Sequence, residues 1–300
     1  MKRKYDKLKL AEKQLEMACV SYSEFNQFKD YASAATLAGA AGEIFHQYLK
    51  LNKNDTTITN GVANVFIKAG IKGIGVQKVR SALRDMSINF FKHRKSKDPL
   101  YVNINCQNEA RNSILMAIID YKEIFQGNQN RFIHVCAIGL AKEFIKAIGI
   151  ETPTEKIFYK DIALEQLKQA IRMFLAKQYV GAITLAGAAD NILISLLETN
   201  GGKCFSKIIK EKNNDESTAG EIRKKINNMF GINAVKHMDS LEDRYIKFDL
   251  KENSWGAILK TLPNYKLLDK DLYNNSVEVR AFLRWMKNNL DPKIYHIDRI

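Results

Sequence analysis

The residues best suited to chemistry are two histidines, each preceded by an asparagine and a lysine at the same spacing. Residues 88–93 read Ile-Asn-Phe-Phe-Lys-His, and residues 232–237 read Ile-Asn-Ala-Val-Lys-His. A neutral imidazole can take a proton from a hydroxyl group and return one to a leaving oxygen, while an amide orients the ring and an ammonium group holds a phosphate oxygen. Such a set could cut RNA at the 2′-hydroxyl without a metal. The candidate catalytic residues are His93, His237, Asn89 and Asn233, and the candidate phosphate-binding residues are Lys92, Lys236 and Arg94.

These sets must be positioned by local structure, which we expect to be helical over about 76–94 and 217–238. On a helix, residues four apart share a face, so asparagine and histidine would lie together. The lysine, one residue before the histidine, could reach over the ring on its flexible stem. A structural alternative remains open: the asparagine and histidine could bond to each other at a helix end and only anchor the connector that follows.

The chain repeats itself beyond these motifs. Residues 29–44 read KDYASAATLAGAAGEI and residues 177–192 read KQYVGAITLAGAADNI, with ten of sixteen positions identical. A second block of similarity starts at the histidine motifs and continues without a gap to Tyr121 and Tyr265. We infer a tandem duplication of one unit, with units at 1–150 and 156–300 and a joint containing Gly149 and Pro153.

The elements of each unit are expected to be helices. Only 4 prolines and 16 glycines occur in 300 residues, which favours helices over turn-rich sheets. The small residues of Thr-Leu-Ala-Gly-Ala-Ala predict tight helix packing, with a steric need for Gly39 and Gly187. The first residues, MKRKYDKLK, are interpreted as the charged beginning of a helix. Apolar and polar residues alternate at 101–104 and 245–248, which allows a short strand at each. Apolar residues at helical spacing predict further helices over 7–22, 28–50, 108–125, 130–147 and 275–290. The fold class is therefore all-α, as two tandem, homologous bundles of four to five helices.

Charge and composition limit the classes of partner that the protein is expected to bind. The net charge of +14 favours nucleic acid or an acidic protein surface, although solvated helix faces in a lysine-rich protein would give the same count. Four widely spaced cysteines and five histidines form no disulfide framework or metal-ligand pattern, so we expect reduced thiols, no metal and no cofactor. No apolar run approaches the ~20 residues that span a bilayer. We expect a cytoplasmic protein without a membrane partner.

The histidine motifs and the small-residue helix resemble the HEPN superfamily of helical nucleotide-binding domains. The HEPN signature is arginine, four to six residues and histidine, often with asparagine after the arginine. Asn89 to His93 and Asn233 to His237 match its Asn-x3-His portion. The helix before each motif is also similar to bacterial proteins with an A-L-T-L-A-G-A-A-E-E-I-L helix and an N-x-L-K-H motif. In place of the arginine this chain has Ile88 and Ile232.

The resemblance implies two functions of different kinds. One is an RNA-binding or metal-independent endoribonuclease effector of a bacterial toxin–antitoxin or phage-defence system. HEPN proteins often place two histidines at a dimer interface, and this chain could build that interface as an intramolecular pseudo-dimer, with Lys92 and Lys236 standing in for the arginine. The other is a non-catalytic, all-helical interaction or scaffold subunit of such a system. The implied partners are RNA or another nucleic acid, or a protein of the system.

Overall fold

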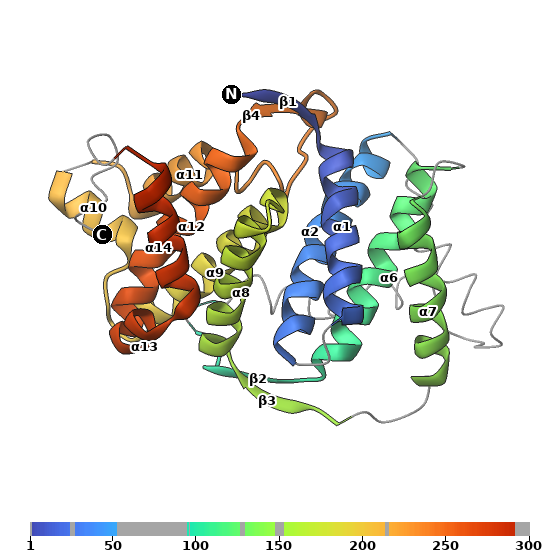
Figure 1. The fold of residues 1–300 in the computed structure, drawn as a ribbon, viewed down its shortest axis with the longest axis horizontal. Helices are drawn as coiled ribbons and strands as arrows, with labels where there is room; N and C mark the ends of the chain where they lie inside the picture. Colours follow the sequence, from blue (N-terminus) through green and yellow to red (C-terminus); the bar gives the residue numbers. More distant parts are fainter. Residues whose placement is uncertain are drawn as a thin grey trace.

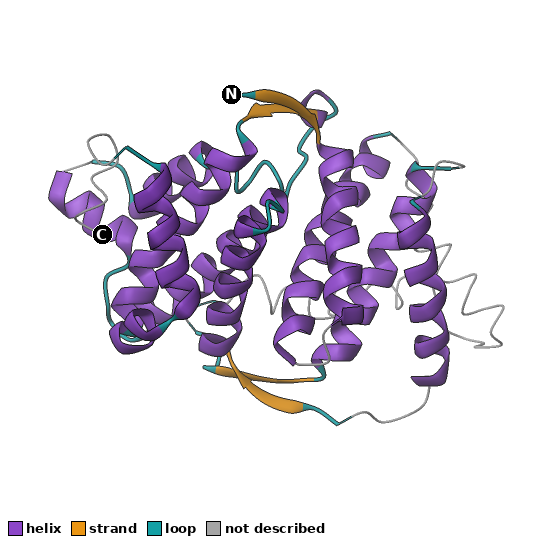
Figure 2. Ribbon diagram, in the orientation of Figure 1, coloured by secondary structure: helices purple, strands orange, loops and turns teal. Residues whose placement is uncertain are grey.

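The fold was examined in a computed structural model, which describes residues 2–24, 28–52, 95, 97–126, 130–147, 153–213 and 216–291. Within these ranges the chain is helical apart from four short strands, so the expected all-α class is confirmed (Figures 1 and 2). One set of the candidate residues lies outside the described ranges, together with the helix expected over 76–94: Asn89, Lys92, His93 and Arg94.

The first half of the chain forms four described helices, which lie to the right in Figure 1, and two strands, which lie at the top and bottom of that view. The helices expected from the sequence agree with the observed ones to within two residues at each end. The elements are β1 (Arg3–Asp6), α1 (Lys7–Glu24), α2 (Phe28–Leu51), β2 (Tyr101–Ile104), α6 (Cys106–Ile124) and α7 (Arg131–Ala147).

The described residues of the second half form seven helices, more than the four or five expected, because two short helices, α10 and α13, fill connections. The elements are β3 (Glu155–Phe158), α8 (Tyr159–Leu175), α9 (Tyr179–Thr199), α10 (Phe205–Asn213), α11 (Ala219–Met229), a 3₁₀ turn (Glu242–Arg244), β4 (Tyr245–Phe248), α12 (Leu250–Leu268), α13 (Lys270–Asn275) and α14 (Val277–Asn289).

The helix that precedes the second histidine motif ends earlier than expected. We predicted helix to about residue 238, but α11 stops at Met229. Gly231 has a φ of 68°, which glycine adopts at little cost, and the Ile232 N–H donates to the Asn227 carbonyl 2.8 Å away. This hydrogen-bond pattern closes a helix end. The motif itself therefore lies in a turn, in which the His237 N–H still bonds the Asn233 carbonyl at 3.0 Å.

The four strands form two antiparallel pairs at opposite edges of the molecule (Figure 2). β1 pairs with β4, from Arg3 opposite Phe248 to Asp6 opposite Tyr245. β2 pairs with β3, from Tyr101 opposite Phe158 to Ile104 opposite Glu155. The interpretation of residues 3–6 as a helix entry was wrong, because β4 supplies a strand partner that lies more than 200 residues away in sequence. Each half thus lends its first strand to the other half.

Buried hydrogen bonds between side chains also cross between the halves. The Gln14 amide of α1 donates to Thr184 Oγ1 of α9 at 2.6 Å, and the Gln166 amide of α8 donates to Thr36 Oγ1 of α2 at 2.8 Å. All four side chains are buried. Helices α1 and α2 contact α8 and α9 here, and one hydrophobic core runs through both halves.

Helix α9, the second copy of the small-residue helix, is the most buried helix in the described part of the chain. Among the described residues it is the one helix long and apolar enough to cross a membrane by length and composition, which corrects the expectation that no segment approaches that length. In this fold 94% of its apolar window is buried inside the protein. The four cysteines carry no disulfide, and Cys19, Cys106 and Cys204 are buried.

Candidate functional site

The two repeated motifs meet in the second half. Added to Gly187 of α9, a Cβ atom would lie 2.4 Å from Ile232 Cγ2 and 3.0 Å from Lys236 Nζ. Only glycine allows the motif turn to lie so close to the helix. The expected steric need at Gly187 is therefore present, but the close neighbour is the histidine turn rather than another helix.

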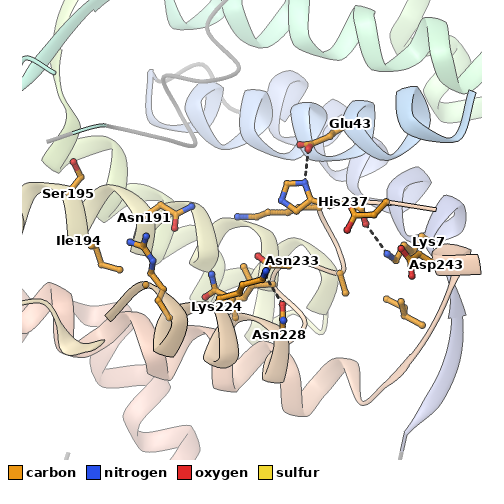
Figure 3. A pocket seen from close by; sticks show the side chains of 18 of the residues that line it. Lys7, Glu43, Asn191, Ile194, Ser195, Lys224, Asn228, Asn233, His237 and Asp243 are labelled. Atoms are coloured by element: carbon orange, nitrogen blue, oxygen red, sulfur yellow. Dashed lines mark hydrogen bonds and ion pairs between the residues drawn. The ribbon is translucent and has the colours of Figure 1, made fainter. Parts of the chain in front are cut away.

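His237 lies at the meeting point of the two halves. Its ring Nδ1 lies 2.6 Å from Oε1 of Glu43, which belongs to α2 of the first half (Figure 3). Lys7 of α1 donates to the backbone carbonyl of His237 at 2.8 Å. The His237 side chain is 43% exposed, so the ring is held without being sealed from solvent.

A polar cavity of about 850 Å³ surrounds this ring. It lies between α2, the C-terminal half of α9, helix α11 and the turn that carries the motif (Figure 3). Its lining includes four asparagines, Asn191, Asn227, Asn228 and Asn233. Its charged lining residues are the cations Lys7, Lys95, Arg223, Lys224 and Lys236 and the anions Glu43, Glu198, Asp239 and Asp243.

The charges are unevenly arranged in the cavity. Lys7 lies among acids: burial lowers its pKa, while Asp243 and Asp239 act in the opposite direction. On α11, none of the described residues forms an ion pair with Arg223 or Lys224. The α11 side of the cavity is thus the one suited to an anionic group.

The other predicted residues of this motif take positions that differ from those expected. Asn233 lines the cavity, but its amide donates to Asn228 Oδ1 at 2.7 Å, so Glu43 rather than Asn233 contacts the ring. Lys236 does not extend over the histidine; it is 5% exposed and lies against Gly187. Ile232, where HEPN proteins have arginine, is buried at the same place.

A buried ion pair between α12 and α9 lies behind the wall of the cavity. Lys260 of α12 bonds to Asp190 of α9 and also donates to Asn227 Oδ1 at 2.6 Å. Asn264 donates to the other oxygen of Asp190 at 2.8 Å. Because Asn227 also lines the cavity, the pair links the core of α9 to the cavity wall.

Sequence reasoning missed most of the residues that line this cavity, among them Glu43, Asn191 and Arg223. Glu43 and Asn191 occupy the same position in the two copies of the small-residue helix, and both are polar in a segment made mostly of small and apolar residues. That pattern could have marked them as lining a shared space. Arg223 gave no comparable signal, since it lies fourteen residues before His237 and its counterpart in the first copy is not basic.

The arrangement can support acid–base chemistry. A carboxylate only accepts hydrogen bonds, so a Glu43 carboxylate holds the proton of His237 on Nδ1 and leaves Nε2 as the nitrogen able to take a proton. No group of three or more histidine, cysteine, aspartate or glutamate side chains in the described part of the chain is placed to hold a metal ion. Comparison of the chain with protein-family models, curated protein sequences and solved structures found no match.

Proposed function

We propose that the chain is a tandem HEPN-like protein, with units at 1–150 and 156–300 folded as an intramolecular pseudo-dimer. The support is reciprocity between the halves. Each unit lends its first strand to the other, and the two strand pairs have the same register when Lys4 is matched with Lys156. Gln14 and Gln166 each reach the matching threonine of the other half. A two-fold relation between the units explains both observations.

We further propose that the cavity binds RNA and that His237 cleaves it without a metal. The observation that carries this proposal is the 2.6 Å contact between Glu43 and His237 at a polar cavity wide enough for a nucleotide. A half-exposed imidazole oriented by a carboxylate from another element is the usual form of a general base. It has no evident role in packing, since the ring is 43% exposed.

The proposed reaction is transesterification within the RNA strand. Nε2 of His237 takes the proton of a 2′-hydroxyl, and the 2′-oxygen attacks the neighbouring phosphorus. The bond from phosphorus to the 5′-oxygen breaks, and the protonated His237 returns its proton to that oxygen as it leaves. The products are a 2′,3′-cyclic phosphate end and a 5′-hydroxyl end. Arg223 and Lys224 supply the positive charge for the phosphate, a role in which Arg223 would replace the HEPN arginine.

A second function is favoured by a different observation. Ile232 and Lys236 are packed against Gly187, so two of the repeated motif residues serve the packing of the turn. A bundle that uses its motif only for packing would be a non-catalytic interaction subunit, the other kind of protein that the HEPN resemblance implies. The protein partner of a defence or toxin–antitoxin system would then replace RNA.

Cleavage of RNA by variants of the purified chain separates the two functions. His237→Ala should abolish cleavage, and Glu43→Gln should slow it by about 10- to 100-fold, because the ring loses its charged orienting partner. A chelator should leave cleavage unchanged. His134→Ala is the matched control, because His134 is an exposed histidine of α7 that does not line the cavity, and should cleave like the unmodified chain. An unmodified chain that leaves RNA intact would support the interaction subunit instead.

A further inference from the structure

The β1–β4 sheet has one face on the core and one face in solvent. Residues opposite each other on paired strands share a face, so Lys4, Asp6, Tyr245 and Lys247 form what we call the outer face. Tyr5 and Phe248 point the other way, where their rings lie 5.8 Å apart against the core. On the outer face Lys4 and Lys247 are exposed and Tyr245 is 49% exposed.

The outer face carries an excess of positive charge that the fold itself does not require. Lys4 lies directly opposite Lys247, and like charges in that position weaken a strand pair. The one acid of the face, Asp6, is already held by Arg244 at 2.8 Å. A negatively charged partner would remove the repulsion between the two lysines.

An exposed aromatic ring lies among these cations. Lys4 Nζ lies 4.5 Å from the centre of the Tyr245 ring, and the Arg244 guanidinium carbon lies 5.4 Å from it. The matching tyrosine of the other sheet, Tyr101, has Lys156 Nζ 4.0 Å from its ring centre. Both sheets thus carry a tyrosine ring that is exposed to solvent and has a lysine ammonium group over it. Proteins that bind single-stranded nucleic acid use such rings to stack on the bases, while neighbouring cations bind the phosphates.

The β1–β4 sheet borders the cavity at the end where Asp6 and Tyr245 lie, whereas the other sheet does not. None of the four outer-face side chains lines the cavity itself, and Ile246 belongs to the face that carries Tyr5. Ile246 of β4, Asp243 just before β4 and Lys7 just after β1 all line the cavity. No residue of β2 or β3 does. A strand that crosses Tyr245 toward this end of the sheet would reach the cavity where Lys7 and Asp243 line it.

We propose that single-stranded RNA reaches the cavity over the outer face of the β1–β4 sheet. Phosphates contact Lys4 and Lys247, and one base stacks on Tyr245. This inference rests on the proposed function and adds the path of the substrate and its single-stranded form. The overall charge of +14 is in keeping with such a partner.

The test measures binding of a fluorescein-labelled single-stranded RNA by anisotropy, in a His237→Ala background so that the RNA stays intact. The double variant Lys4→Gln/Lys247→Gln should weaken binding at least about tenfold. It should also flatten the salt dependence of the logarithm of the affinity by roughly 1.4, about 0.7 for each lost phosphate contact. Tyr245→Ala should weaken binding by about 5- to 100-fold. Melting curves verify that each variant is folded before its RNA affinity is compared.

The matched controls are Tyr101→Ala and Lys156→Gln, which alter the same pair on the sheet that does not border the cavity. Each should change RNA affinity less than about twofold, because no residue of β2 or β3 lines the cavity. Equal losses from the two sheets, or unchanged binding by the β1–β4 variants while the unmodified chain still cleaves RNA, would overturn this inference alone. Equally strong binding of poly-glutamate would replace RNA by an acidic protein partner. An unmodified chain that neither binds nor cleaves RNA would overturn the proposed function as well.

Discussion

Ile232 lies so close to Gly187 that no larger residue fits at position 187 without movement: a Cβ there would come within 2.4 Å of the isoleucine Cγ2. We predict that Gly187→Ala lowers the free energy of unfolding by about 1–3 kcal/mol, because α9 and the motif turn must separate. Gly139→Ala is the control. No atom lies within 4 Å of its added Cβ, and Gly139 lies inside helix α7, so this variant should gain about 0.5–1 kcal/mol. Urea unfolding of both variants measures the difference, and a Gly187→Ala protein as stable as the parent would contradict the account of this contact.

The buried pair of Lys260 and Asp190 offers a second prediction. Lys260→Met should destabilise the fold by about 3–5 kcal/mol, because it leaves a carboxylate that is 0% exposed without its cation. Lys160→Met breaks the more exposed pair of Lys160 with Asp269 and should change stability by about 1 kcal/mol or less. Thermal or urea unfolding compares them. Equal effects of the two variants would show that the Lys260 pair is not sealed from water.

The reciprocal glutamines give a third prediction. Gln14→Leu and Gln166→Leu should each lower the free energy of unfolding by about 1–3 kcal/mol, since each leaves a buried threonine without its donor. Gln14→Leu should have the larger effect, because Gln14 also donates to the Val235 carbonyl at 3.0 Å. Gln169→Leu, on the half-buried side of α8, should have little effect. If neither buried substitution changed stability, the claim that these two hydrogen bonds help to hold the halves together would be contradicted.

The stability of the protein should also depend on Asp120 of α6. Burial, with the nearby Glu123, raises the pKa of this carboxyl to about 8. The unfolded chain releases the same proton near pH 4, so between about pH 4 and 8 the folded state binds more protons and this contribution to stability falls as pH rises. Asp120→Asn cannot ionise. Its stability relative to the parent should therefore increase across that window, as measured by urea midpoints, and a difference that stays constant would refute the assignment.

Local sequence patterns were sufficient to predict the helices because helices are local structures. Periodicity identified α1, α2, α6, α7 and α14 to within two residues at each end. The same reasoning failed at β1, whose pairing with β4 depends on a contact across most of the chain. It also extended α11 too far, because the motif keeps helical spacing while Gly231 redirects the backbone.

The site was predicted only in part for a similar reason. The sequence identified His237 and Asn233 by repetition, and the two lie together at the cavity. It assigned ring orientation to Asn233, although Glu43 makes that contact from 194 residues away. It also expected Lys236 to reach over the ring and bind a phosphate, whereas Lys236 is buried against Gly187. A side chain that reaches the site from a distant element, as Glu43 does, has no fixed spacing in the sequence from which its role could be inferred.

The central claim, that His237 acts on the 2′-hydroxyl of a bound RNA strand, is tested most directly by analysing the ends that it produces. The purified chain is incubated with a short single-stranded RNA in excess chelator, and the products are weighed by mass spectrometry. We predict 2′,3′-cyclic phosphate ends from the unmodified chain. We predict none from His237→Ala, and none at a nucleotide whose 2′-hydroxyl has been replaced by hydrogen. Intact RNA with the unmodified chain, or the same cyclic ends from His237→Ala, would contradict the claim.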